Sequence, residues 1–351
     1  MKSKIALALA LLFLAPGCAS TENKEDPLLA MPGLEEFRPA DRVLILAPHP
    51  DDEAIACAGV IQEALAKKAA VRVAYLTNGD RNQWAFIAYK GNIAFRPAQF
   101  IHLGEIRRDE AIAAMQALGL KRDDLVFLGY PDFGIFHIFS RYWQTKERFS
   151  DILTHISRVP YKDNPSFGAD YNGENVLRDL KKAIADFRPN KIFVSHPADA
   201  NFDHKTLYLF TEVALSDLEG QLPRPKLYPY LVHCVGWPQP RHYHPNLRLS
   251  PPPSFAASQI RWQDFVLSDA KAQKKRRAVL SYRSQTRCSA FYLFSFCRRN
   301  ELFGAYPDIE LENQVSPKEQ GISFFEFAPL FSRPKSVGPV GISGNVSELK
   351  K

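Results

Sequence analysis

The stretch LILAPHPDDEAIA, residues 44–56, decides the fold class expected for this chain. Its apolar run stops at Pro48, and an imidazole and three carboxylates follow within residues 49–53. A short apolar run bounded by a turn residue is typical of a buried strand in a parallel sheet. Ligands bind at the carboxyl ends of such strands, so these polar side chains mark a candidate site.

Outward from this stretch, apolar runs of strand length alternate with helical patterns, which predicts βα units on a mostly parallel sheet. The expected strands cover residues 42–47, 71–77, 125–128, 191–195 and 230–235. The expected helices cover residues 52–68, 105–118, 175–187, 204–218 and 262–282. Two aromatic and polar insertions, 80–103 and 130–173, interrupt the pattern, and long insertions usually carry function or cover a site.

The composition is that of a globular protein, with 46% hydrophobic and 24% charged residues among 351. The formal net charge is +7, and residues 271–277, KAQKKRR, hold much of the local excess. This run lies in a helical pattern, where one solvated basic face is common. We therefore expect no nucleic-acid partner, and attraction to anionic glycans or lipid headgroups fits better.

The N-terminus reads as an export signal. Lys2 and Lys4 precede an apolar run too short to span a bilayer, and LAPGC ends at Cys18. This ending resembles the lipobox of bacterial lipoproteins, in which the cysteine becomes the lipidated first residue; an ordinary signal peptide with a chance cysteine is the alternative. Either way we expect the mature protein to work outside the cytoplasm. In the lipoprotein case we expect it in the cell envelope, lipid-anchored at the periplasmic face or at the cell surface.

These patterns predict five segments: a signal peptide (1–18), a tether (19–40), a core (41–235), an extension packed on the core (236–331) and a mobile tail (332–351). Beyond Cys18 the chain has four cysteines and no CxxC pair, which excludes a zinc ribbon. A Cys288–Cys297 bridge and buried free thiols are both open.

A second polar cluster follows the apolar run at residues 191–195. Within HPADANFDH, residues 196–204, the chain gathers His196, Asp199, Asp203 and His204. Helix capping could explain a single aspartate such as Asp52, but not two groups of imidazoles and carboxylates at two strand ends. We therefore expect the two clusters to form one site.

The chemistry that suits these groups is a divalent metal that holds a water. His49, Asp52 and His204 offer two imidazole nitrogens and one carboxylate oxygen, the pattern of catalytic zinc sites and of some non-haem iron sites. Zinc is the expected ion, with Fe²⁺ as the alternative. Asp51, beside the ligating carboxylate, suits a general base.

At this point the sequence resembles the LmbE-like or PIG-L family of N-acetylglucosamine deacetylases. The matching residues are HPDDE at 49–53, NFDH at 201–204, TNGD at 77–80, Arg107 with Glu110, and YPD at 130–132. The resemblance implies a Rossmann-like fold, zinc held by His49, Asp52 and His204, and Asp51 as the base. It also implies that Arg107 and Asp132 approach the sugar.

One position departs from the family pattern. Members commonly carry histidine where this chain has Asn201, and an amide cannot relay a proton. His196 and His233 are the candidates for the missing acid, with a structural histidine as the alternative for each. Asp203 is expected to orient the metal ligands, and Asp199 to shape the loop or support a ligand.

The predicted function is metal-dependent removal of the N-acetyl group from an N-acetylglucosamine-containing glycan or glycoconjugate in the envelope. Two alternatives stay open at this stage. Metal-dependent phosphoesterases also use histidine and aspartate at strand ends, but they prefer two metals and more ligands. A lipid-anchored glycan-binding protein that has lost catalysis would fit Asn201.

Overall fold

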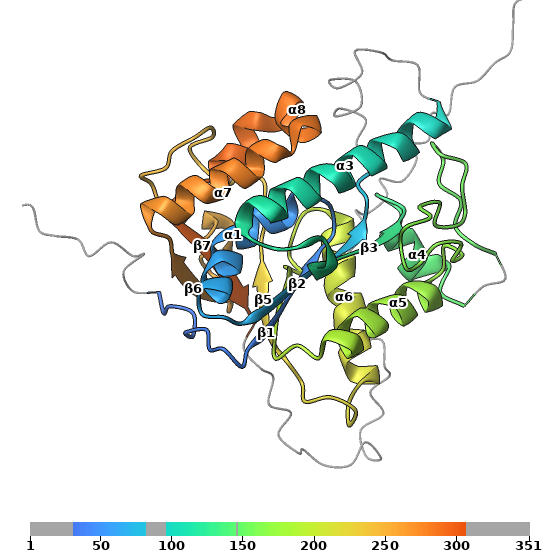
Figure 1. Ribbon diagram of the computed structural model, residues 1–351, viewed down its shortest axis with the longest axis horizontal. Helices are drawn as coiled ribbons and strands as arrows, with labels where there is room; N and C mark the ends of the chain where they lie inside the picture. Colours follow the sequence, from blue (N-terminus) through green and yellow to red (C-terminus); the bar gives the residue numbers. More distant parts are fainter. Residues whose placement is uncertain (1–30, 82–95, 145–146, 307–351) are drawn as a thin grey trace, which may run out of the picture. The chain divides into compact units, whose positions relative to one another are not determined.

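The computed structural model describes residues 31–81, 96–144 and 147–306. A seven-stranded sheet in the order β3-β2-β1-β4-β5-β7-β6 forms its centre (Figure 1). The first five strands are parallel, and β7 is antiparallel to β5 and to β6. The strands are β1 (Arg42–Ala47), β2 (Ala70–Thr77), β3 (Leu125–Tyr130), β4 (Lys191–Ser195), β5 (Lys226–Tyr230), β6 (Arg261–Val266) and β7 (Asn300–Ala305). The predicted mostly parallel α/β sheet is confirmed.

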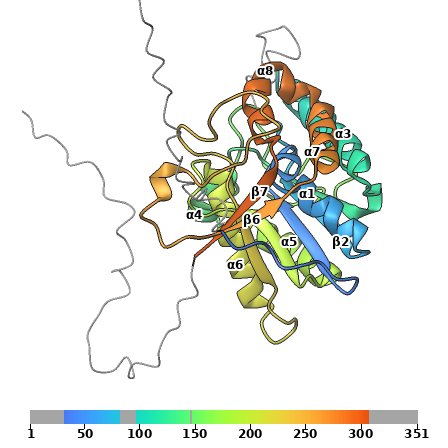
Figure 2. The ribbon, with the colours of Figure 1, turned by 90° about the vertical axis from the view of Figure 1, so that its left-hand side faces the viewer.

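Helices lie on both faces of this sheet (Figures 1 and 2). One layer holds α1 (Asp52–Ala66), α3 (Pro97–Leu118), α7 (Asp269–Ser281) and α8 (Arg283–Leu293); the other holds α4 (Ile135–Arg141), α5 (Gly173–Phe187) and α6 (Phe202–Asp217). Short 3₁₀ helices cover Arg122–Asp124, Pro253–Phe255 and Phe294–Phe296.

The sequence of β1 is apolar at almost every position because both faces of this strand are buried. Val43 and Ile45 pack into the hydrophobic core on the side of α1, whereas Leu44 and Leu46 pack into the core on the side of α5 and α6. Because successive strand residues point to opposite faces, a strand covered on both sides must be apolar at every position. This burial fixes the end of β1, and with it the position of the HPDDE turn.

The helix expected over 262–282 is wrong in its first part. Residues Arg261–Val266 form strand β6, which pairs antiparallel with β7, and α7 begins only at Asp269. Ser268 caps that helix by accepting a hydrogen bond from the Lys271 N–H. The segment RWQDFV does not alternate polar and apolar residues, so the sequence gives no clear sign of this strand at the edge of the sheet.

The strand expected over 230–235 is also misplaced, since β5 ends at Tyr230. The N–H groups of Val232 and His233 donate instead to Oδ2 of Asp199, at 3.0 and 2.9 Å. A carboxylate thus replaces the neighbouring strand as hydrogen-bond acceptor, and the apolar run leaves the sheet early.

The basic run 271–277 lies on α7, but it is not one solvated face. Lys275 is fully buried, and its Nζ lies 2.9 Å from Oε1 of Glu301 on β7. The same carboxylate accepts the N–H groups of Gly59 and Val60 in α1, at 2.8 and 3.1 Å. A buried lysine needs such a partner, so this pair links α7, β7 and the middle of α1.

The described parts of the chain also bear on the segments expected at the N-terminus. Cys18 and most of the predicted tether lie outside the described residues, but Phe37, within that tether, packs into the core. The cysteines at 57, 234, 288 and 297 are free thiols. Among the described helices, none combines the length and the apolar character needed to cross a bilayer.

Candidate metal centre and active site

The two polar clusters meet because β1 and β4 are neighbours in the sheet. Both strands end at the same edge, and the chain turns from β1 into α1 and from β4 into α6. His49 lies in the first turn, Asp52 begins α1, and His204 lies in the first turn of α6. All three side chains are buried. The strand order reverses at this point, which is where open α/β sheets bind ligands.

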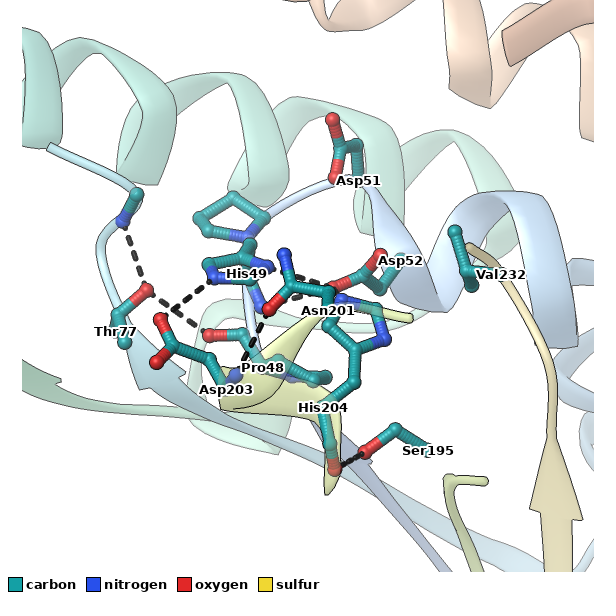
Figure 3. A network of polar contacts seen from close by, with 12 residues as sticks. Pro48, His49, Asp51, Asp52, Thr77, Ser195, Asn201, Asp203, His204 and Val232 are labelled. Atoms are coloured by element: carbon teal, nitrogen blue, oxygen red, sulfur yellow. Dashed lines mark hydrogen bonds and ion pairs between the residues drawn. The ribbon is translucent and has the colours of Figure 1, made fainter. Parts of the chain in front are cut away.

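The proposed ligand set is assembled in the structure (Figure 3). Nδ1 of His49 and Nε2 of His204 lie 3.3 and 3.2 Å from the same oxygen, Oδ2 of Asp52. The two ring centroids are 5.2 Å apart, and one ligand atom from each of the three residues lies within 4.8 Å of the others. Two imidazole nitrogens and a carboxylate oxygen therefore face a common point.

The second nitrogen of each ring meets a further carboxylate. Nε2 of His49 lies 3.1 Å from Asp132 and 3.3 Å from Asp203, and Nδ1 of His204 lies 3.3 Å from Asp199. Metal-ligating histidines usually donate their other N–H to a carboxylate, which fixes the ring orientation and raises its basicity. Asp132 and Asp203 thus both lie against the ring of His49, and the orienting role expected for Asp203 stays a prediction.

The backbone fixes these supporting carboxylates in turn. Asp203 accepts the N–H groups of Phe133 and Ile135, at 2.6 and 3.3 Å. One oxygen of Asp199 accepts the N–H groups of Val232 and His233, and its other oxygen accepts the N–H of Asn201 at 2.8 Å. Loops from three strand ends therefore converge on the two imidazoles through carboxylate bridges.

The electrostatics of the cluster favour a cation. Burial alone would lower the pKa of both imidazoles, but Asp132 holds the pKa of His49 well above its usual range, and Asp199 with Asp52 raises that of His204 to about 10. Burial would raise the pKa of Asp52, yet the two imidazoles hold it well below its usual range. The negative field that retains a proton on each ring would also attract a divalent ion in place of those protons.

A direct test of fit comes from the hydrogen bonds. Both ring nitrogens of His204 are buried and neither makes a well-aligned hydrogen bond among the described residues, although Nδ1 lies 3.3 Å from Asp199 and Nε2 lies 3.2 Å from Asp52. Buried polar atoms without partners are rare, and each calls for an explanation such as an ion. Because Nε2 faces Asp52 beside Nδ1 of His49, the residues present fit a zinc-type ligand set.

The capping alternative for the aspartates does not match the structure. Asp51 is the N-cap of α1 but makes no side-chain capping hydrogen bond. Oδ2 of Asp52 accepts the N–H of His49, at 3.0 Å, which ties the carboxylate to the preceding turn. The side chain of Asp51 points instead toward α3 (Figure 3), where Oδ2 lies 3.4 Å from Nη2 of Arg107. Burial raises the pKa of Asp51 to about 7, although Arg107 opposes the shift.

Arg107 contacts the HPDDE turn and lines the cavity. Its guanidinium is almost fully buried and donates to the carbonyl oxygens of Pro50 and Gly79, at 2.6 and 2.8 Å. Gly79 has a φ of 64°, and a Cβ there would lie 2.1 Å from Nη1 of Arg107. The glycine of the TNGD motif therefore makes room for the arginine. The substrate contact expected for Arg107 stays a prediction.

Asn201 and the two histidines considered as the general acid, His196 and His233, occupy different places in the structure. Asn201 lines the cavity, and its side-chain oxygen caps α6 by accepting the N–H of Asp203 at 2.8 Å. His196 is buried elsewhere, its ring 6.0 Å from that of Trp262, and it does not line this cavity. His233 lines the cavity, with its ring centroid 4.7 Å from that of His204. Of the two histidines, His233 is the one that faces the site.

The cavity at the cluster is lined by residues of both the predicted core and the predicted extension. It is lined by His49, Asp51, Asp52, Ile55, Arg107, Asp132, Phe133, Asn201, Val232, His233, Gln285, Ser289, Tyr292 and Leu293. The last four belong to α8, a helix whose contribution the sequence does not signal. Tyr292 donates a hydrogen bond to the carbonyl oxygen of Val232 at 2.7 Å, which fixes α8 against the loop that carries His233.

Residues 44–215 match the model of the PIG-L family, described as GlcNAc-PI de-N-acetylase. The chain therefore carries a domain of the PIG-L, or LmbE-like, family, as its two motifs predict. No curated protein matches the chain.

Solved structures with a similar fold include proteins of different activities. The conserved protein TT1542 from Thermus thermophilus is 22% identical, with a TM-score of 0.41 over 70% of this chain and 79% of that one. The N,N'-diacetylchitobiose deacetylase from Pyrococcus horikoshii is 18% identical, with a TM-score of 0.41 over 70% and 71%. GalB, the 4-carboxy-2-hydroxymuconate hydratase from Pseudomonas putida, is 16% identical, with a TM-score of 0.45 over 78% and 100%. At these identities the likeness concerns the fold alone.

Proposed function

We propose that this protein is a zinc-dependent hydrolase that removes the N-acetyl group from an N-acetylglucosamine-containing glycan or glycoconjugate. The observation that carries the proposal is the convergence of His49 and His204 on one oxygen of Asp52. The match of residues 44–215 to a de-N-acetylase family supports the reaction class.

The chain's own residues supply the remaining chemistry. Zinc held by His49, Asp52 and His204 would polarise the acetyl carbonyl and lower the pKa of a water. Asp51 lies in the same cavity and takes the proton when water attacks the amide carbon. The bond from carbon to nitrogen then breaks, acetate is released, and the nitrogen leaves with a proton as an amine.

His233 is the residue we assign to the leaving side of this reaction. Asn201 cannot relay a proton, and its oxygen is engaged at the start of α6. The ring of His233 faces the cavity beside His204, and its backbone is held by Asp199. It can donate a hydrogen bond to the developing oxyanion or to the departing nitrogen.

The metal clusters favour a single ion over the phosphoesterase alternative. Among described residues, two further groups could hold a metal: Asp199 with His204 and His233, and Asp132 with Asp203 and His49. Each shares a histidine with the central group and places carboxylates on that ring's second nitrogen. These carboxylates are already used to orient ligands, which leaves no separate ligand set there for a second ion.

The test combines two measurements on one sample. Purified protein is incubated with N-acetylglucosamine and chitooligosaccharides, released acetate is measured, and bound metal is counted by mass spectrometry. We expect acetate release and one zinc per chain. Two ions per chain together with hydrolysis of a phosphate ester would overturn the proposal, and glycan binding without any acetate release would favour a non-catalytic protein.

We further propose that the protein is anchored in the cell envelope through a lipid on Cys18, with a membrane surface and its glycans as partners. The LAPGC ending of the export signal supports this proposal. Mass spectrometry of the mature N-terminus should find a lipid-modified cysteine, and Cys18→Ser should release the protein from the membrane fraction. An unmodified N-terminus at another residue would contradict the proposal.

A further inference from the structure

Asp51 has a backbone conformation that few residues adopt. Its φ is 123° and its ψ is −28°. A residue with a Cβ is strained at such positive φ values, and strain of this kind persists only where the surroundings impose it. Two side chains contact Asp51 and can impose it: Arg107 contacts its carboxylate, and Glu53 accepts its backbone N–H.

Glu53 is the third carboxylate of the HPDDE motif, and the proposed mechanism gives it no part. Its side chain is fully buried, and Oε2 accepts the N–H of Asp51 at 3.1 Å. Oε1 accepts a hydrogen bond from the hydroxyl of Tyr282, which is itself fully buried. A chain of hydrogen bonds therefore runs from Tyr282 through Glu53 to the backbone of Asp51.

Tyr282 lies between α7 and α8, far along the chain from the motif. Two residues later, Ser284 donates its N–H and its hydroxyl to Glu110 on α3, at 2.8 and 2.6 Å. Glu110 lies about one helical turn after Arg107, whose guanidinium contacts the Asp51 carboxylate. The residues at the junction of α7 and α8 thus bond both to α1, through Glu53, and to α3, through Glu110. These are the two helices whose side chains contact Asp51.

We propose that Tyr282 and Glu53 are positioning residues that hold Asp51 in the strained conformation in which its carboxylate faces the cavity. This inference rests on the proposed function, in which Asp51 is the base. Neither residue lines the cavity, so both act through Asp51. The inference assigns to a segment beyond the family-matched residues 44–215 a role in the geometry of the HPDDE turn.

The test compares three substitutions with a matched control. Tyr282→Phe removes the hydroxyl, Glu53→Leu removes both acceptors, and Glu53→Gln keeps an acceptor for the Asp51 N–H. The control is Tyr228→Phe, which also removes the hydroxyl of a buried tyrosine. Tyr228 lies on β5, stacks on the ring of Phe193 and does not line the cavity.

We expect kcat for acetate release to fall about 10-fold in Tyr282→Phe and about 100-fold in Glu53→Leu, because a displaced base loses its alignment. KM, bound zinc and melting temperature should stay close to wild type, and Glu53→Gln should stay within a few-fold of wild-type kcat. The control should keep its kcat. An unchanged kcat in both Tyr282→Phe and Glu53→Leu would overturn the inference. A decrease in bound zinc and in melting temperature that parallels the decrease in kcat would also overturn it.

A second readout separates this inference from the proposed function. Amide hydrogen exchange of the peptide that contains Asp51 should be faster in Tyr282→Phe than in wild type or in the control, because Glu53, which accepts this N–H, is no longer held by the tyrosine hydroxyl. This measurement needs no substrate. Absence of acetate release by the wild type would refute the deacetylase proposal, whereas unchanged exchange in Tyr282→Phe would refute the positioning role.

Discussion

His49 and His204 contact one and the same oxygen of Asp52, although the two histidines lie far apart in the sequence. Because both rings converge on this atom, removal of either ring removes a ligand without replacing it. We expect His204→Ala to bind less than a tenth of an equivalent of zinc, where the wild type binds one. Metal counting after dialysis checks this, and full zinc occupancy in the variant would refute the ligand set.

Asp199 should increase the affinity for the metal without being a ligand itself. Its Oδ2 lies 3.3 Å from Nδ1 of His204, on the side of the ring away from Asp52. Loss of such a supporting carboxylate weakens metal binding by about 10- to 100-fold. Competition with a zinc chelator should show this decrease in Asp199→Ala, with binding still measurable. A complete loss equal to that in His204→Ala would make Asp199 a ligand.

Asp51→Asn should separate catalysis from metal binding. The amide is similar in size, but it cannot accept the proton of the attacking water, and such a loss typically costs about 10²- to 10⁴-fold in rate. We expect kcat to fall by about that factor while one zinc per chain remains bound. Asp109→Asn, an exposed carboxylate on α3, is the control. Retained activity in Asp51→Asn would remove Asp51 from the role of base.

Substitution of the two histidines distinguishes the candidates for the missing acid. His233 lines the cavity, whereas His196 packs among aromatic rings outside it. We therefore expect His233→Gln to lower kcat by about 100-fold, and His196→Gln to leave kcat within a few-fold of wild type. Steady-state kinetics on metal-loaded samples decides the matter. The reverse order would return the role to His196.

His196 should instead make stability depend on pH. Its Nδ1 accepts the N–H of Ala198 at 3.0 Å, and its ring lies against Phe255, Trp262 and Tyr306. Burial lowers its pKa to about 4, although Asp199 opposes the shift. At His196 the folded state therefore binds fewer protons than the unfolded state between pH 6.5 and 4, so the contribution of this residue to the free energy of unfolding falls as pH decreases through this range.

The size of this effect is about 3 kcal/mol if the whole shift contributes. Urea unfolding at about pH 7.5 and about pH 4.5, on either side of most of this titration, should show a smaller loss of stability for His196→Phe than for the wild type. An identical pH dependence in both proteins would show that the neutral imidazole is not what the fold requires.

The convergence of the two polar clusters could be predicted because each cluster follows a strand that is apolar at almost every position. Such a strand must be covered on both faces, so HPDDE and NFDH had to leave the sheet at its edge. The same reasoning did not place Asn201, which serves as the N-cap of α6. A polar residue before a helical pattern signals a cap, but the motif resemblance drew the interpretation toward catalysis.

The part of the site that is formed by residues after β5 gives weaker signals in the sequence. His233 follows an apolar run that reads as a strand, yet its backbone bonds to Asp199 instead of to the sheet. Tyr282 reads as an ordinary aromatic at the end of a helix, since what distinguishes it is a contact with Glu53 across 229 positions. Long-range contacts of single side chains leave no periodicity in the sequence, so the role of α8 could not be predicted.

The buried pair of Lys275 and Glu301 sets a limit on how the chain can be divided. Glu301 belongs to the last described strand, yet it bonds to the middle of the helix that begins with the ligand Asp52. A truncation that kept only the family-matched residues would leave α1 without this support and would uncover the apolar side of that helix. We therefore expect the smallest fragment that keeps this site folded to extend at least to β7.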